Sequence, residues 1–361
     1  MKKNTDYKKT DGAYADTILP GIKYLKLGAP LSMQFELTSG CNQRCVFCYN
    51  VWKEKSNCPE PKTLTKKEQL KILDIVIENK ILDIIFSGGE PLLVPWLEEL
   101  VERISTQNIK SSLITNAILL TEEKAISLKK SGLSSIQISL HHHIEEINNY
   151  LVGSDTFQKT VTGIKNSLKI FGSDCINVNM VALPETYKDV YEMSKFLQSI
   201  GINHFSVGTP SATGEMSKNK EIIITKNNFT QIYNQLIKAK HNLKMNTSFT
   251  GGFPLCILPK IDKETLSMVN NYCDAGLNQL IISSDGSLRP CVCLNHNLGN
   301  ILTDDLKKIW VKNIFLKNIR QLKYLPNECL SCQYIHMCRG GCRASAYGFY
   351  GKINANDPLI K

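Results

Sequence analysis

Short apolar runs alternate along the chain with longer segments in which apolar residues recur at helical spacing. Segments that begin at Thr65, Thr121 and Tyr187 predict helices, and Thr65 with Glu68 three residues later predicts a capping box. The apolar runs have the length and composition of β-strands. Six such runs are present, at 33–38, 81–87, 111–115, 135–140, 176–183 and 202–208.

The regular alternation of strand and helix predicts an α/β fold. Its parallel sheet would be wound by right-handed crossovers, either doubly wound or curled into a barrel. In both arrangements the chemistry belongs at the carboxyl ends of the strands. Successive predicted strands are followed there by a cysteine-rich segment at 40–48, by SGGEP at 87–91, by Asn116 and by three histidines from His141. We therefore expect these features on one face.

The character of the chain changes near residue 250. Beyond this point helical periodicity weakens, turns become more frequent, and eight of the thirteen cysteines occur. We expect an N-terminal extension at 1–32, a strand and helix domain at 33–250 and a cysteine-rich domain at 251–361. Cys58 and Cys175 belong to no motif and are interpreted as structural.

Composition and charge narrow the classes of function. The net charge is +10, and the lysines are scattered through predicted helices. This favours an acidic partner over nucleic acid, which is usually bound by a continuous basic surface. No apolar run approaches the ~18 residues of a spanning helix and no signal peptide is recognisable, so we expect a cytoplasmic protein without a membrane partner. Thirteen cysteines in that reducing compartment indicate metal or cluster ligation instead of disulfides.

Three cysteines lie close together in the segment that follows the first predicted strand. Cys41, Cys45 and Cys48 have C-x3-C-x2-C spacing. An iron-sulfur cubane usually takes a thiolate at each iron, so three thiolates leave one iron open to a small molecule with an amine and a carboxylate. Zinc with a distant fourth ligand is the alternative interpretation.

The segment resembles the signature of radical S-adenosylmethionine (SAM) enzymes, C-x3-C-x-aromatic-C, with Phe47 at the aromatic position. A second mark of that family is a GGE-like motif after strand two. Gly88, Gly89 and Glu90 match it, in the right order and at the expected strand end. The resemblance implies a partial (β/α)6 TIM-type barrel.

The resemblance also implies a reaction. A [4Fe-4S] cluster on the three cysteines would bind SAM, and an electron would cleave SAM to methionine and a 5'-deoxyadenosyl radical that removes a hydrogen atom from substrate. Glu90 and the backbone of Gly88 and Gly89 would contact the SAM amino group, and Phe47 would lie beside the adenine. An external donor such as flavodoxin or ferredoxin would supply the electron.

Further polar side chains are predicted near this face by position alone. Ser139 and Asn179 are candidates for contacts with the ribose or carboxylate of SAM, and ordinary strand packing is the alternative. His141 would point inward with Ser139 if the strand alternation continues. It is a weak candidate for passing a proton or touching substrate, and a solvent-exposed loop histidine is the alternative.

The C-terminal cysteines recur at regular spacing, which indicates ligation. They form C-x12-G-x4-C and C-x2-C-x5-C-x3-C patterns, built from Cys273, Gly286, Cys291, Cys329, Cys332, Cys338 and Cys342. Zinc sites are the alternative. The patterns resemble the SPASM extension of radical SAM enzymes, which implies one or two auxiliary [4Fe-4S] clusters in a C-terminal cysteine-rich SPASM domain.

The SPASM resemblance implies a division of these ligands. The nearer auxiliary cluster would be bound by Cys273, Cys291 and Cys342, and the farther one by Cys329, Cys332 and Cys338. The chain departs from the SPASM pattern at its end, where Ile360 stands at the place of a final cysteine. Asp357 is the candidate replacement, and a three-coordinate or unstable farther cluster is the alternative. Cys293 is favoured as the fourth ligand of the nearer cluster, with Cys256 as the alternative.

Most families that share this architecture modify a peptide or protein side chain. The resemblance therefore implies a radical SAM oxidoreductase of peptide maturation that crosslinks, epimerises or oxidises its substrate. About thirty residues precede the first strand, too few for the winged-helix leader-binding module of many peptide maturases. A small-molecule enzyme is the alternative, for haem-precursor side-chain modification or sugar alcohol dehydrogenation. A non-catalytic iron-sulfur or zinc scaffold is a third hypothesis, and it would leave Glu90 without a purpose.

Overall fold

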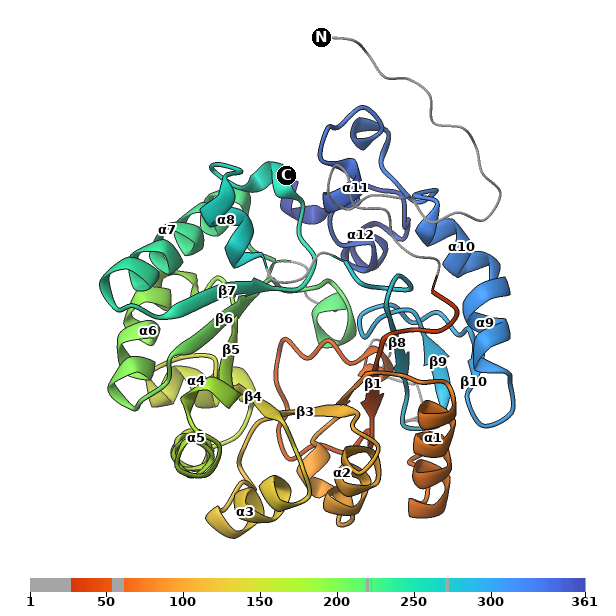
Figure 1. Ribbon diagram of the computed structural model, residues 1–361. Helices are drawn as coiled ribbons and strands as arrows, with labels where there is room; N and C mark the ends of the chain where they lie inside the picture. Colours follow the sequence, from red (N-terminus) through yellow and green to blue (C-terminus); the bar gives the residue numbers. More distant parts are fainter. Residues whose placement is uncertain (1–26, 54–61, 219–220, 222, 270–272, 361) are drawn as a thin grey trace.

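The computed structural model describes residues 27–53, 62–218, 221, 223–269 and 273–360, so Cys58 lies outside the described residues. Its central element is one curved sheet with helices around the outside (Figure 1). The six predicted strands are all present as parallel neighbours. They are β1 (Ser32–Glu36), β2 (Asp83–Ser87), β3 (Lys110–Thr115), β4 (Ser135–Ser139), β5 (Ile176–Val181) and β6 (His204–Gly208).

Further strands extend this sheet at both sides. β7 (Asn246–Thr250) pairs in parallel with β6, and β8 (Gln279–Ile282) pairs in parallel with the free side of β1. β9 (Ser287–Arg289) and β10 (Gly299–Asn300) then add in antiparallel register. The resulting order is β10-β9-β8-β1-β2-β3-β4-β5-β6-β7. The predicted α/β partial barrel is thus confirmed, and backbone hydrogen bonds join it to the cysteine-rich region.

The helices between the barrel strands form the outer layer (Figure 1). They are α1 (Lys66–Glu78), α2 (Leu97–Ser105), α3 (Glu122–Lys130), α4 (Glu145–Val152), α5 (Phe157–Phe171), α6 (Val190–Ser199) and α7 (Lys226–Asn242). Thr65 caps α1 with the predicted reciprocal capping box to Glu68, and Thr121 caps α3 without one. The capping box predicted at Thr65 is thus confirmed, and the local signal agrees with the fold.

The strands carry apolar side chains on their outer face and polar ones on their inner face. The apolar set is buried against the helices and includes Phe35, Phe86, Ile138, Val178 and Phe205. On the inner face Gln34 donates to Ser87 at 2.7 Å, and Asn177 donates to Ser206 at 2.8 Å. Pairing satisfies these polar groups inside the barrel, and it leaves the interior lined for polar ligands instead of filled by an apolar core.

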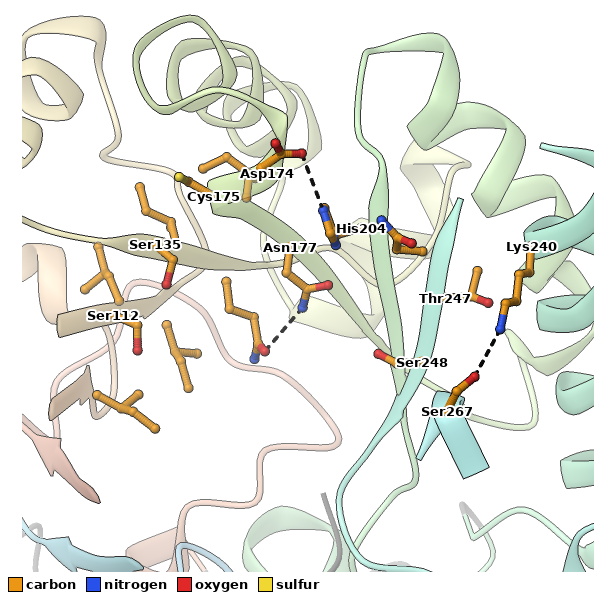
Figure 2. A pocket seen from close by; sticks show the side chains of 17 residues that line it. Ser112, Ser135, Asp174, Cys175, Asn177, His204, Lys240, Thr247, Ser248 and Ser267 are labelled. Carbon is orange, nitrogen blue, oxygen red and sulfur yellow. Dashed lines mark hydrogen bonds and ion pairs between the residues drawn. The ribbon is translucent and has the colours of Figure 1, made fainter. Parts of the chain in front are cut away.

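The barrel interior holds two cavities whose linings share Ile114 and Gln137. The larger, about 600 Å³, lies at the amino ends of the strands, where Figure 2 shows Asp174, His204 and Lys240 beside it. The smaller, about 150 Å³, lies at the carboxyl ends. Barrel enzymes place their chemistry at the carboxyl ends, and the predicted site residues line this smaller cavity, so we treat it as the candidate site.

The C-terminal region adds short helices. They are η7 (Leu255–Ile257), α8 (Lys263–Met268), α9 (Leu306–Lys312), α10 (Ile314–Arg320), α11 (Ile335–Cys338), α12 (Arg343–Tyr350) and η9 (Pro358–Ile360). α8 packs beside β7, whereas α9 lies beside β9 and β10 (Figure 1). Trp310 of α9 is fully buried and donates to the carbonyl of Leu27. Among the described residues, none of the helices has the length and apolar character needed to cross a membrane.

Candidate functional site

All ten residues that the sequence assigned to the first site line one cavity. It lies where β1, β2, β4 and β5 end, and its volume is about 150 Å³. The ten residues are Cys41, Cys45, Phe47, Cys48, Gly88, Gly89, Glu90, Ser139, His141 and Asn179. Residues from four separate strand ends therefore share one space, as expected for a barrel active site.

The three-cysteine segment is anchored on the end of α4. The backbone N–H of Arg44 donates to Val152 at 2.9 Å, and that of Val46 donates to Leu151 at 3.0 Å. Gly153, with φ of +61°, follows α4, and a Cβ at this position would lie 2.8 Å from the carbonyl oxygen of Arg44. A glycine is needed there because the backbone is left-handed and the two segments touch.

The glycines of the GGE motif pack directly against the same segment. Gly89 N–H donates to Thr38 at 2.7 Å, and Glu90 N–H donates to Gly40 at 2.8 Å. A Cβ added to Gly89 would stand 2.1 Å from the Gly40 carbonyl oxygen, a distance that no side chain tolerates. The two sequence motifs are thus physically one unit, in which the turn after β2 supports the loop that carries the thiols.

The Glu90 side chain ties the end of β2 to the end of β3. It is 1% exposed, and its carboxylate accepts hydrogen bonds from Leu92 N–H (3.0 Å), Thr115 Oγ1 (2.7 Å) and Asn116 N–H (2.9 Å). Burial raises the pKa of Glu90, and these donors oppose the rise. The side chain acts here as a positioning group, and its contact with the SAM amino group stays a prediction.

One cation faces the three thiols. Burial raises the pKa of Cys41, Cys45 and Cys48, and the positive charge of Lys53 opposes the rise at each of them. Metal ligation requires the thiolate form, so Lys53 favours the state that binds. Sequence analysis missed Lys53 because no spacing rule links a lysine five positions beyond the last cysteine to the cluster loop.

His141 is buried, so its alternative interpretation as a solvent-exposed loop residue is wrong. It is 4% exposed, its ring lies 4.4 Å from the Phe47 ring, and its Nδ1 accepts from Val181 N–H at 3.2 Å. Burial lowers the pKa of His141 to about 3. The ring is therefore neutral near pH 7 and carries its proton on Nε2, which can donate a hydrogen bond. The next residue, His142, is also buried, and its Nε2 lies 3.3 Å from Oδ2 of Asp189.

Asn179 is oriented by two hydroxyl groups. Its Oδ1 accepts from Ser206 at 2.9 Å and from Thr250 at 2.8 Å, which leaves its amide nitrogen as a donor at the cavity. Gln137 and Asn116 also line the cavity but were not among the predicted site residues. Gln137 could have been found, since it lies two positions before Ser139 and shares its face of β4.

The nearer auxiliary thiols lie together with Cys293. Burial raises the pKa of Cys291 well above its usual value, and the charges of Cys293, Cys342 and Cys273 raise it further. Two buried hydroxyls, Ser211 and Thr213, lower the pKa of Cys293 through side-chain hydrogen bonds. Hydroxyl donors of this kind suit the sulfur atoms of a cluster.

The farther auxiliary thiols form a separate group. Burial raises the pKa of Cys329, and among the other groups that raise it are Cys338 and Cys332. Asp357 does not contact this group directly through a described hydrogen bond. Its carboxylate accepts a hydrogen bond from the backbone N–H of Cys342, a residue of the nearer group, at 2.6 Å. Within the described ranges, no three or more His, Cys, Asp or Glu side chains are grouped so as to hold a single metal ion.

Comparison with known families accounts for both cysteine regions. Residues 35–197 match the radical SAM superfamily, and residues 273–333 match the iron-sulfur cluster-binding domain SPASM. The chain contains a radical SAM domain. This radical SAM enzyme therefore joins a SAM-cleaving barrel to a SPASM domain, as the spacing of its cysteines predicted.

Relatives of this radical SAM enzyme have more than one activity. It is 24% identical to the AdoMet-dependent heme synthase of Oleidesulfovibrio alaskensis, over 98% of this chain and 92% of that protein. It is 24% identical to the mycofactocin maturase MftC of Mycobacterium tuberculosis, over 92% of this chain and 83% of MftC. SuiB of Streptococcus suis, solved with its precursor peptide SuiA, has the same fold with a TM-score of 0.72 and 19% identity, over 92% of this chain and 76% of SuiB.

The residues present fit a [4Fe-4S] cluster with SAM. Among the described residues, three thiols line the cavity, so a cubane held by these three would keep one iron for an outer ligand. When bound, the cluster supplies the electron that cleaves SAM to a 5'-deoxyadenosyl radical, the species that abstracts hydrogen from substrate. The described side chains contribute charge and position: Lys53 opposes the rise in the pKa of the thiols, Glu90 fixes the turn, and Asn179 leaves its amide nitrogen free to donate at the cavity.

Proposed function

We propose that this radical SAM enzyme modifies a side chain of a peptide or protein, as an oxidoreductase of peptide maturation. The proposal rests chiefly on the fold that the chain shares, over 92% of its length, with SuiB bound to its precursor peptide. The similarity to the mycofactocin maturase MftC supports the same class of substrate. A heme synthase relative that spans 98% of this chain makes a haem precursor the second candidate.

The proposed site follows from the geometry of the cavity. Cys41, Cys45 and Cys48 would ligate the SAM-binding cluster, and Gly88, Gly89 and Glu90 would stand at the SAM amino group. Ser139 and Asn179 offer donors for the SAM ribose or carboxylate, and Phe47 would lie against the adenine. His141 would meet the substrate as a neutral hydrogen-bond donor, because its low pKa prevents it from acting as a cationic acid near pH 7.

The auxiliary thiols support an oxidative outcome. Auxiliary clusters have potentials set by ligands, hydrogen bonds and burial, so they can accept the electron that a substrate radical loses on oxidation. An external donor such as flavodoxin or ferredoxin would supply the electron for SAM cleavage, and the net charge of +10 favours an acidic protein of that kind. The twelve described cysteines are all free, which suits the reducing cytoplasm.

The test is anaerobic reconstitution followed by product analysis. With reductant and SAM, the enzyme should form 5'-deoxyadenosine, and Cys45→Ala should abolish this product. Cys338→Ala, which alters only the farther auxiliary group, should still cleave SAM but lose substrate turnover. If Cys45→Ala cleaved SAM at the native rate, the assignment of Cys45 as a ligand of the SAM-binding cluster would be wrong.

The substrate class needs a separate measurement. Peptides from short reading frames beside the gene should be incubated with enzyme and examined by mass spectrometry. Loss of two hydrogens indicates crosslinking or oxidation, and deuterium uptake without another mass change indicates epimerisation. If such peptides stay unmodified while a porphyrin precursor is converted, the small-molecule candidate replaces the peptide proposal.

A further inference from the structure

A cysteine outside the SPASM spacing pattern stands beside the farther auxiliary group. Cys256 occupies the middle of η7, between Leu255 and Ile257. Both neighbours are 1% exposed and belong to the main core, whereas Cys256 is exposed. The two buried side chains fix the backbone of η7, so the thiol between them points out of the core.

The η7 segment is bonded directly to one of the farther thiols. The backbone N–H of Leu255 donates to the sulfur of Cys338 at 3.3 Å. Backbone N–H groups that donate to ligand sulfur are one of the means by which a protein sets a cluster's potential. The residue adjacent to Cys256 therefore already touches the predicted cluster-binding group.

The four thiols interact through their charges. Burial raises the pKa of Cys256, and the charges of Cys338 and Cys332 raise it further. Cys256 in turn raises the pKa of Cys329. The hydrogen bond from Leu255 N–H to the sulfur of Cys338, at 3.3 Å, shows how closely the segment that carries Cys256 approaches the farther group.

Asp357, the candidate ligand from the sequence, accepts backbone hydrogen bonds with both of its carboxylate oxygens. Its Oδ2 accepts from Cys342 N–H at 2.6 Å, and its Oδ1 accepts from Leu359 N–H at 2.9 Å. The carboxylate is 1% exposed and also fills the space that a Cβ on Gly341 would need, at 2.6 Å. It braces the start of α12 beside the nearer group and leaves the farther group without an oxygen ligand from this position.

We propose that Cys256 is the fourth thiolate ligand of the farther auxiliary [4Fe-4S] cluster, with Cys329, Cys332 and Cys338. The inference is independent of the substrate class. On ligation the thiol of Cys256 loses its proton to solvent and its sulfur bonds iron, with no change in oxidation state.

The proposal assigns the farther cluster a definite role. A cubane with four thiolates has no iron left for a substrate, so it serves electron transfer and not substrate binding. Together with Cys293 in the nearer group, Cys256 gives the chain two sets of four thiols. The fourth ligand of the farther cluster then comes from upstream of Cys273, the first cysteine of the SPASM pattern.

The test isolates the auxiliary clusters. In full-length protein with Cys41, Cys45 and Cys48 all changed to Ala, the iron that remains belongs to the C-terminal thiols. Adding Cys256→Ala should remove up to half of that iron and sulfide or convert one cluster to a three-iron form seen by electron paramagnetic resonance. Adding Cys175→Ala, the matched control from outside both thiol sets, should change neither quantity.

Two further variants separate ligation from misfolding and from the rival ligand. Cys256→Ser should retain more iron than Cys256→Ala but with an altered resonance spectrum, because an oxygen replaces the sulfur. Asp357→Asn should keep the spectrum of the farther cluster. Unchanged iron and spectrum in Cys256→Ala, or loss of the farther cluster in Asp357→Asn, would overturn the proposal. Circular dichroism identical to the parent shows that each variant is folded.

Discussion

Arg289 of β9 forms a buried ion pair with Glu36 of β1, the strand that leads into the three-cysteine segment. The same guanidinium donates to the carbonyl of Val292 at 3.0 Å, and Val292 separates Cys291 from Cys293. Burial raises the pKa of Glu36, and Arg289 opposes the rise. One side chain therefore fixes the position of the nearer auxiliary thiols relative to the strand that precedes the SAM-binding thiols.

Removal of Arg289 should be costly, because it leaves Glu36 charged, buried and unpaired. We expect Arg289→Met to lower the free energy of unfolding by about 3–5 kcal/mol, measured by anaerobic chemical denaturation. The double variant with Glu36→Gln should recover part of this loss, since the uncompensated charge is gone. Arg289→Met as stable as the parent protein would show that the pair contributes nothing.

Gly89→Ala should detach the GGE turn from the thiol loop. The added methyl group would need the space of the Gly40 carbonyl, 2.1 Å away, so the loop must shift. A displacement near 1 Å at a reacting centre costs roughly 100-fold in rate, and we expect a loss of this order in 5'-deoxyadenosine formation. Gly28→Ala, at a position with nothing within 4 Å, is the matched control and should retain the native rate.

Lys53→Gln should make the SAM-binding cluster harder to reduce. Lys53 is the cation that opposes burial at all three thiols, and its loss removes positive charge from a site that gains an electron. The reduction potential should fall by tens of millivolts in a titration followed by electron paramagnetic resonance. Lys110→Gln changes an exposed lysine at the amino end of β3 and should not change the reduction potential of the cluster.

His141 predicts a pH dependence of stability with a definite sign. Its pKa is about 3 in the folded protein, against 6.5 for an ordinary histidine. Between these values the unfolded chain binds a proton that the folded chain does not, so stability falls as the pH falls. From pH 6.5 to pH 5 this loss is about 2 kcal/mol.

The measurement compares wild type with His141→Gln, which keeps a polar side chain that does not titrate. Wild type should lose about 2 kcal/mol more unfolding free energy than the variant between pH 6.5 and pH 5. Equal losses in the two proteins would mean that His141 is accessible to protons in the folded state.

Local spacing was enough to predict six strands, the first thiol group and the GGE motif, because each depends on residues a few positions apart. β7 escaped prediction since its sequence, NTSFT, contains one large apolar residue. It is a strand because it completes the polar wall of the barrel, where Thr250 reaches Asn179. The period-two pattern is hard to recognise in β7 because Phe249 is the one large apolar residue on its outer face.

The spacing of residues within a motif could not predict contacts between segments that are distant in the sequence. Cys256 was considered, as the alternative to Cys293, for the nearer auxiliary cluster, whereas the backbone of its neighbour Leu255 bonds Cys338 of the farther group. Asp357 was chosen by its position before the chain end, and its carboxylate instead caps the Cys342 backbone. In both cases the chain path, not the motif, decides which side chains meet.

β1 has a parallel neighbour on each side, β2 from the barrel and β8 from the SPASM region. A fragment ending near residue 250 would leave one flank of β1 without its hydrogen-bonding partner, and a bare flank of this kind invites aggregation. The two regions therefore share one sheet, and β1 receives backbone hydrogen bonds from both of them.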